Sequence, residues 1–158
     1  MSEDHRRFMR EAIRLAEQGM QAGDGGPFGA VVVRDGEIVG RGWNRVLATN
    51  DPTAHAEVNA IRDACRRLGR YWLEGCELFV NCQPCPMCGG AIRWAHIAKV
   101  YYAATTADAA AIGFDDEAIA RDICRPADTQ QLPTEQLLRE ETLAVFRAWE
   151  DLPQRKDY

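Results

Sequence analysis

The sequence lacks any long hydrophobic run. Apolar runs such as Ala30–Val33 are short, whereas a membrane-spanning helix needs about 18 or more apolar residues in succession. The first residues, Met1–Asp4, also lack the charge pattern of a secretory signal peptide. We therefore expect a chain that works in the cytoplasm and has no membrane contact.

Repeats, low-complexity blocks and Pro/Gly/Ser-rich linkers are absent as well. The 158 residues suffice for one domain of ordinary size but leave no room for a second full domain. Hydrophobic residues make up 46% and charged residues 27% of the chain, which excludes a wholly disordered, collagen-like or coiled-coil protein. We expect a single domain over residues 1–158.

An excess of positive charge is missing too. The chain has 19 Lys and Arg against 24 Asp and Glu, and its net charge is −5. An acidic chain attracts the phosphate backbone of nucleic acids weakly, although a local basic patch can persist within it. The charge balance therefore disfavours nucleic acid as the partner.

Cysteine is too scarce for a disulfide-dense secreted scaffold, since the chain has six. Three of them, Cys82, Cys85 and Cys88, nevertheless fall within seven residues. In a chain without a secretory signal, such crowding indicates metal or redox chemistry. Cys82 adjoins this group. The other three are interpreted as small core residues: Cys65, Cys76 and Cys124.

Expected helices and strands alternate along the chain. Apolar residues at helical spacing predict a helix over 3–19, and the Asp35-Gly36 turn signal joins two expected strands, 29–33 and 37–43, into a hairpin. The later elements are predicted as follows: a helix over 55–68 with its N-cap within Asp51–Thr53, a strand over 76–81, a helix over 86–95, a strand over 99–103, and helices over 117–123 and 134–149. This order indicates an α/β domain with a mixed sheet covered by helices on its faces.

Two short motifs stand at the starts of two of these helices. They are Thr53-Ala54-His55-Ala56-Glu57 and Pro84-Cys85-Pro86-Met87-Cys88. One imidazole and two thiols give three ligands for Zn²⁺, which is the pattern of a catalytic site whose fourth position is left to water. Cys85 and Cys88 are three residues apart in a first helical turn, so their sulfurs share a face and the positive end of the helix favours both thiolates.

Glu57 is the expected proton acceptor beside such a site. Zinc lowers the pKa of a coordinated water from roughly 15.7 to about 7, and the released proton needs a carrier. Glu57 follows His55 by two residues and can pass that proton to a leaving amine. Together these residues match H-x-E…P-C-x-x-C, the signature of zinc-dependent nucleobase deaminases. Each motif alone is weaker evidence for a deaminase, because Cys-x-x-Cys also occurs in redox dithiols and in structural zinc sites.

With these residues the chain resembles the cytidine deaminase-like superfamily and, within it, the branch of bacterial guanine deaminases. The likeness extends over essentially the whole chain. It is carried by Gly26–Ala30, Trp43-Asn44, Asp51–Glu57 and Pro84–Cys88 for the superfamily, and by Gly113–Asp116, Phe146–Trp149 and Lys156–Tyr158 for the branch.

The resemblance implies a three-layer α/β/α domain with a five-stranded mixed sheet. It implies that His55, Cys85 and Cys88 hold Zn²⁺ and that Glu57 shuttles protons. The implied reaction is hydrolytic deamination of a small purine base, guanine, to xanthine and ammonia. The implied assembly is a homodimer in which the C-terminal segment is exchanged between subunits, so that Tyr158 closes the pocket of the other subunit.

The pocket implied by the resemblance has Asn44 and Asp115 as polar readers of the base and Phe28 and Trp94 as aromatic walls. Taken alone, these residues have other interpretations. Asn44 can satisfy turn backbone, Asp115 can cap a helix, and the two aromatic rings can belong to the core. Gln83 departs from the family pattern, because these enzymes commonly carry Glu before Pro-Cys, and this leaves the local hydrogen bonding open.

Three rival functions share parts of this pattern. A tRNA adenosine deaminase also carries the Asp51–Glu57 run, but it grips an RNA loop with basic and aromatic surface, which an acidic chain without a basic tail does not favour. Deamination of cytosine or another aminated ring differs only in the shape of the pocket. A non-catalytic zinc module would not need Glu57, because a structural site uses no proton shuttle.

Overall fold

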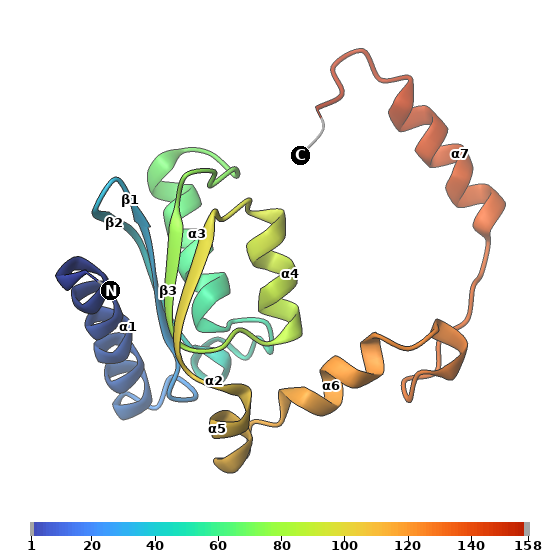
Figure 1. Ribbon diagram of the computed structural model, residues 1–158. Coiled ribbons are helices and arrows are strands. Elements are labelled where there is room, and N and C mark those ends of the chain that lie inside the picture. The colour runs from blue at the N-terminus through green and yellow to red at the C-terminus, as the bar shows by residue number, and fades with distance from the viewer. Residues whose placement is uncertain (1, 157–158) are drawn as a thin grey trace. The chain divides into compact units, whose positions relative to one another are not determined.

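Within residues 2–156, which the computed structural model describes, four strands form one mixed sheet (Figure 1). Their order across the sheet is β2-β1-β3-β4, and their bounds are β1 Gly29–Arg34, β2 Glu37–Trp43, β3 Glu77–Cys82 and β4 Lys99–Ala104. Strand β1 is antiparallel to β2 and to β3, whereas β3 and β4 are parallel. The α/β class and the mixed character of the sheet, both predicted from the sequence, are confirmed.

The β1–β2 hairpin closes at the turn that Asp35-Gly36 predicts. Both residues have positive φ angles, 51° at Asp35 and 78° at Gly36. A two-residue turn of this kind matches the twist of its flanking strands, and aspartate and glycine adopt positive φ at low cost. The turn thereby fixes which strand residues pair, and with them the face of the sheet on which each side chain lies.

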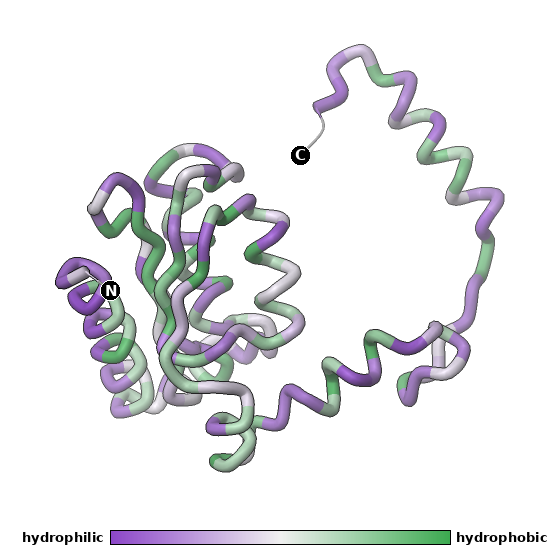
Figure 2. The backbone as a smooth tube through the Cα atoms, viewed as in Figure 1, coloured by the Kyte–Doolittle hydropathy of each residue, from purple (hydrophilic) through white to green (hydrophobic). Residues whose placement is uncertain are grey.

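Helices pack on both faces of the sheet (Figure 1). Helix α1 (Glu3–Gln21) covers one face, and α3 (Ala56–Leu68) and α4 (Pro86–Trp94) lie on the other. Alternate residues of a strand point to opposite faces, so that Val31 and Val33 pack with the α1 layer and Val32 packs with the α3 layer. Figure 2 shows the resulting apolar stretches in β1 and β3. Burying one valine or phenylalanine side chain completely stabilises the folded chain by roughly 1.5–3 kcal/mol.

Two glycines let α3 approach β2 closely. A Cβ atom at Gly40 would lie 2.5 Å from the carbonyl oxygen of Ala60, and one at Gly42 would collide with the carbonyl oxygen of Ala56. Side chains at these two positions would therefore push the helix away from the sheet. Because Gly40 and Gly42 have no side chains, the first turn of α3 lies close to β2. The first predicted site residues lie in this turn.

The sheet ends at β4, so that it has four strands in residues 2–156 rather than the expected five. Directly after β4, the side chain of Thr105 accepts a hydrogen bond from the backbone N–H of Asp108, whose carboxylate accepts one from the backbone N–H of Thr105. This capping box starts helix α5 (Thr106–Ala111), which the sequence did not predict. The chain becomes helical there, and the expectation of a fifth strand is wrong for residues 2–156.

The predicted helices are confirmed, but the start of α3 is not where the sequence placed it. Its N-cap is His55, and Asp51 instead accepts hydrogen bonds from the backbone N–H and the hydroxyl of Thr53. The short helix α2 (Val46–Thr49) was not predicted, because four residues are too few to show a helical period. Among the helices of residues 2–156, none has the length and apolar character needed to cross a membrane.

The described part of the chain divides into two compact units, residues 2–117 and residues 118–156. The second unit includes most of α6 (Asp116–Ile123), a 3₁₀ turn at Ala127–Thr129 and helix α7 (Arg139–Glu150). Helix α7 begins at Arg139 rather than at residue 134. None of its described side chains is buried, and its apolar members Val145 and Phe146 are 66% and 59% exposed.

A carboxylate on the half-buried side of α1 ties this helix to β2. Glu11 accepts hydrogen bonds of 2.7 and 2.9 Å from Arg14 and one of 3.0 Å from Arg41 of β2. The hydrogen bonds from Arg14, and after them those from Arg41, lower the pKa of Glu11 from 4.5 to about 2, against the opposing effect of burial. The ionised carboxylate is thus more stable in the folded chain than in the unfolded chain.

We expect Glu11→Gln to lower the free energy of unfolding at pH 7 by on the order of 1 kcal/mol, because Arg14 and Arg41 lose a charged acceptor. Since the folded-state pKa is the lower one, this contribution is complete above pH 4.5 and fades as the pH falls towards 2. Urea unfolding at pH 7 and at pH 3 measures the difference. Glu17→Gln, on the exposed side of α1, is the control. An equal loss at both pH values would contradict the ion-pair explanation.

Candidate active site

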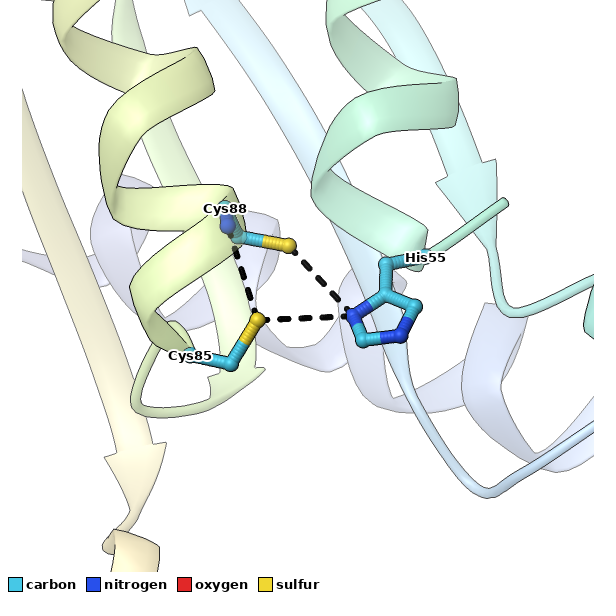
Figure 3. A group of neighbouring side chains, drawn as sticks. All are labelled: His55, Cys85 and Cys88. Carbon is cyan, nitrogen blue, oxygen red and sulfur yellow. Dashed lines mark hydrogen bonds between the residues drawn. The ribbon is translucent and has the colours of Figure 1, made fainter. Parts of the chain in front are cut away.

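His55 lies at the start of α3. It is the N-cap residue, and its φ of −71° and ψ of 159° give it an extended backbone. Its imidazole is half-buried and faces the first turn of α4 (Figure 3). The close packing of α3 on β2 therefore determines where this ring lies.

Cys85 occupies the same position in α4 that His55 occupies in α3. It is the N-cap residue, and its Sγ accepts a hydrogen bond of 3.4 Å from the backbone N–H of Cys88. Pro86 fills the first helical position, where its fixed φ suits the helix and its missing N–H costs nothing. Cys88 is fully buried one turn further on. Both sulfurs lie at the positive end of α4, which favours the thiolate forms.

The three side chains form a ligand set with the dimensions of a zinc site. Nδ1 of His55 lies 3.6 Å from Sγ of Cys85 and 3.5 Å from Sγ of Cys88, and the three atoms are all within 4.8 Å of one another (Figure 3). Zinc–sulfur bonds of about 2.3 Å and zinc–nitrogen bonds of about 2.0–2.1 Å, set at tetrahedral angles, give an N···S edge of about 3.6 Å. The residues present fit Zn²⁺, and they are positioned to bind it.

The charges of the ligand set also favour a cation. A hydrogen bond from Cys88 lowers the pKa of Cys85 to about 4, and His55 adds to this effect. The interaction with Cys85, together with burial, raises the pKa of Cys88. The hydrogen bond with Cys85 raises the pKa of His55. A metal ion would bind the deprotonated thiols, so its binding releases protons.

Glu57 lies in the first turn of α3 and is only 6% exposed. Burial is the largest effect on its carboxyl group and raises the pKa, and the negative charge of Cys85 raises it further. A buried carboxyl group with a raised pKa beside a candidate metal site is a candidate general acid–base. Sequence spacing alone placed Glu57 beside His55, and the structure places it on the wall of the same cavity.

A cavity of about 340 Å³ opens over the ligand set. His55, Glu57 and Cys85 border it, and most of its remaining lining is apolar. This volume lies in the range of small-molecule sites, about 300–1,000 Å³. The cavity suits a small, largely flat molecule that makes a few polar contacts.

Two of the predicted pocket residues line this cavity. Phe28 does so together with Phe114, and the two rings meet edge to face with centroids 4.9 Å apart. Asn44 is 5% exposed, and its Oδ1 accepts hydrogen bonds of 3.2 Å from the backbone N–H groups of Gly26 and Val46. Asn44 thus accepts hydrogen bonds from turn backbone, which is one of the two roles that the sequence allowed. Its side chain also borders the cavity.

Of the two neighbouring aspartates, Asp116 lines the cavity, whereas Asp115 is not among the described residues that line it. Asp115 is exposed, and its carboxylate accepts a hydrogen bond of 3.2 Å from the backbone N–H of Glu117 at the start of α6. Asp116 is half-buried and lines the cavity. Burial raises the pKa of Asp116, and the charge of Cys85 adds to this effect.

The other predicted pocket residues have different placements. Trp94, at the end of α4, is 68% exposed and is not among the described residues that line the cavity. Gln83, which departs from the family pattern, lines the cavity with its half-buried side chain, and its backbone N–H donates to the carbonyl of Ala104. Tyr158 lies outside the described residues.

Sequence reasoning missed Asp116 and Phe114. Both belong to the Gly113–Asp116 segment that carries the resemblance, and both line the cavity. No local pattern distinguishes Asp116 from Asp115, because the two acidic residues are adjacent at the start of α6.

Comparisons with known proteins agree with this geometry. Residues 2–104 match the family model described as the cytidine and deoxycytidylate deaminase zinc-binding region. The guanine deaminase of Bacillus subtilis (strain 168) is 50% identical over 155 residues, which are 98% of this chain and 99% of that protein. An X-ray structure of guanine deaminase from Bacillus subtilis matches with a TM-score of 0.94 at 49% identity, covering 100% of this chain and 99% of that chain.

A further relative is matched over a shorter part of the chain. The tRNA-specific adenosine deaminase of Aquifex aeolicus (strain VF5) is 45% identical over 97 residues, which are 61% of this chain and 64% of that protein. The matched family region contains Glu57 and the three residues positioned to bind a metal ion, His55, Cys85 and Cys88. The chain therefore belongs to the cytidine and deoxycytidylate deaminase family that is defined by this zinc-binding region.

Proposed function

We propose that this chain catalyses the hydrolytic deamination of guanine to xanthine and ammonia. The observation that carries the proposal is the extent of the likeness to the guanine deaminase of Bacillus subtilis, which runs through 98% of the chain. It therefore includes residues beyond 104, where the family region ends. The likeness to the tRNA-specific adenosine deaminase of Aquifex aeolicus covers 61% of the chain.

We assign the three metal ligands as His55, Cys85 and Cys88, because their spacing matches the edges of a zinc tetrahedron. When bound, the zinc ion would supply an activated water molecule for attack on the ring carbon that bears the amine. Three protein ligands would leave one tetrahedral position for that water, and two of them, His55 and Cys85, border the cavity.

Glu57 carries the proton in this proposal. Its carboxyl group takes a proton from the attacking water and passes it to the amine, which leaves as ammonia. The buried position of Glu57 keeps bulk water away from this transfer, and the raised pKa lets the carboxyl group hold the proton between the two steps.

The remaining cavity residues hold the base. Phe28 and Phe114 provide apolar ring surface for a flat purine. Asn44 offers its amide N–H₂ to an acceptor on the base, since its Oδ1 is occupied by backbone donors. We propose Asp116 for the reading role that the sequence suggested for Asp115, because Asp116 borders the cavity and can accept from N–H groups of the purine.

We further propose that the chain acts as a homodimer with an exchanged C-terminal segment. Helix α7 exposes apolar side chains, including Trp149 at 44%, and a helix this short is marginal without a packing partner. A second copy supplies that partner. In this assembly Tyr158 closes the cavity of the other subunit. The thiol ligands must stay reduced, and all six cysteines are free, which supports action in the cytoplasm.

A substrate panel tests the proposed activity. The zinc-loaded protein should release ammonia from guanine faster than from adenine, cytosine, guanosine, cytidine or an adenosine-containing tRNA, measured at equal concentrations. The cavity fits a free base, and its acidic residues disfavour a phosphate backbone. Preference for the tRNA would instead support the adenosine deaminase alternative.

Two variants serve as controls for this panel. Glu57→Gln should keep its zinc while guanine turnover falls by roughly 10²- to 10⁴-fold, the usual effect of losing a general acid–base. Cys88→Ser should lose zinc together with turnover, because it removes one of three ligands. Zinc content by metal analysis separates the two cases, and near-normal turnover in Glu57→Gln would remove that residue from its role.

The two neighbouring aspartates provide a matched test of base recognition. We expect Asp116→Asn to lower kcat/KM for guanine by roughly tenfold or more, because the substitution replaces one of two acceptor oxygens by an N–H₂ donor, and a mismatched polar contact costs about 1–3 kcal/mol. Asp115→Asn should stay within about twofold of the native value, since Asp115 is exposed and caps α6. Equal activities of the two variants would contradict the assignment of Asp116.

Mixing two inactive variants tests the exchanged homodimer. A chain that lacks Lys156–Tyr158 should retain zinc but turn over guanine slowly, and Glu57→Gln should be nearly inactive. If the tail acts across the dimer, a mixed dimer combines an intact Glu57 on one chain with an intact tail on the other. Activity should then reappear on mixing, provided that mass spectrometry shows subunit exchange. Exchange without recovered activity would refute the shared site.

A further inference from the structure

The side-chain amide of Asn44 has a fixed orientation. Its Oδ1 accepts hydrogen bonds from the backbone N–H groups of Gly26 and Val46, both at 3.2 Å. Its Nδ2 makes no hydrogen bond to any other residue in the described part of the chain, and the side chain borders the cavity. The donor end of the amide is thus the end that is left for a ligand.

Asp24 connects the two residues on either side of Asn44. The indole Nε1–H of Trp43 donates to Oδ2 of Asp24 at 2.6 Å, and Nε of Arg45 lies 3.9 Å from the same oxygen. The guanidinium group of Arg45 also lies over the ring of Trp43, 5.6 Å from its centroid. We call these three residues the Asp24 cluster: Asp24, Trp43 and Arg45.

The Asp24 cluster is anchored to the rest of the fold. The ring of Trp43 rests against α1 at Gly19, where a Cβ atom would collide with it. The backbone carbonyl of Asp24 accepts hydrogen bonds of 3.0 Å from the N–H groups of Leu47 and Ala48 in α2. The carboxylate of Asp24 is only 24% exposed, so its hydrogen bond to the indole is partly shielded from water.

None of the three members of the Asp24 cluster is among the described residues that line the cavity. Their effect on a ligand therefore passes through Asn44, which lies between Trp43 and Arg45 in the chain and borders the cavity. Misplacing a binding group by about 1 Å is enough to cost a large factor in binding or rate.

We propose that Asp24 is a positioning residue for substrate binding, because it fixes Trp43 and Arg45 and thereby holds the amide of Asn44 in the orientation that binds the base. The inference rests on the proposed function. In this proposal the carboxylate of Asp24 lies outside the cavity and orients the amide donor of Asn44, which borders the cavity.

The first test is steady-state kinetics of the zinc-loaded protein with guanine. Asp24→Ala should raise KM about tenfold and leave kcat within about twofold, because the metal ligands and Glu57 are untouched. Asp35→Asn, at the exposed hairpin turn, is the control for loss of a surface carboxylate and should change neither constant. An unchanged KM in Asp24→Ala overturns the proposal, and so does a fall in kcat alone.

A double-mutant cycle separates positioning through Asn44 from a general structural role. Asn44→Asp keeps an oxygen for the backbone N–H groups of Gly26 and Val46 but removes the N–H₂ donor. If Asp24 acts through that donor, adding Asp24→Ala to Asn44→Asp should change KM by less than about twofold. A further tenfold rise in the double variant would show that Asp24 acts independently of Asn44, and would overturn the proposal.

A measurement without substrate keeps the inference separate from the proposed function. In ¹H–¹⁵N spectra, Asp24→Ala should shift the side-chain amide signals of Asn44 and the indole signal of Trp43, which Trp43→Phe identifies. Asp35→Asn should shift neither. Unshifted Asn44 signals overturn the positioning role even if guanine is the substrate, whereas shifted signals in a protein that does not deaminate guanine support the positioning of Asn44 and refute the proposed substrate.

Discussion

The site depends on the meeting of two helix N-termini. Helices α3 and α4 lie on the same face of the sheet, and their N-cap residues, His55 and Cys85, bring Nδ1 and Sγ to 3.6 Å. Two features hold the helices there. Gly40 and Gly42 allow α3 to lie directly on β2, and only three residues separate the end of β3 from the start of α4. The positive ends of both helices then act on the same few atoms, which favours the thiolate forms that a metal ion binds.

This arrangement gives the cavity an unusual charge balance. Of the described ionisable side chains that line it, only His55 can carry positive charge, whereas Glu57, Asp116 and the thiols are acidic. Burial raises the pKa values of Glu57 and Asp116. A neutral base with N–H groups meets hydrogen-bond acceptors in such a cavity. This charge balance supports the small purine base of the proposed function.

The two units of the chain differ in how well they are packed. In residues 2–117 the strands bury apolar side chains on both faces, with Phe79 and Val32 almost wholly inaccessible. In the second unit the apolar residues of α7 stay exposed, and no described side chain of that helix is buried. Amphipathic helices owe most of their stability to packing rather than to intrinsic propensity. The second unit is thus the part of the chain whose stability depends most on finding a packing partner.

The sequence by itself determined most of the helices and strands and the candidate ligand set, because short-range patterns specify both. Turn chemistry marked Asp35-Gly36, helical period marked α1, and motif spacing marked His55, Cys85 and Cys88. Only the tertiary structure decided the strand count among residues 2–156, the exposure of Trp94 and the choice of Asp116 over Asp115. Local sequence patterns do not decide these points, because neighbouring residues of one segment have similar propensities for secondary structure and exposure. Which side chain reaches a cavity depends on how the backbone turns and on the elements that pack around it.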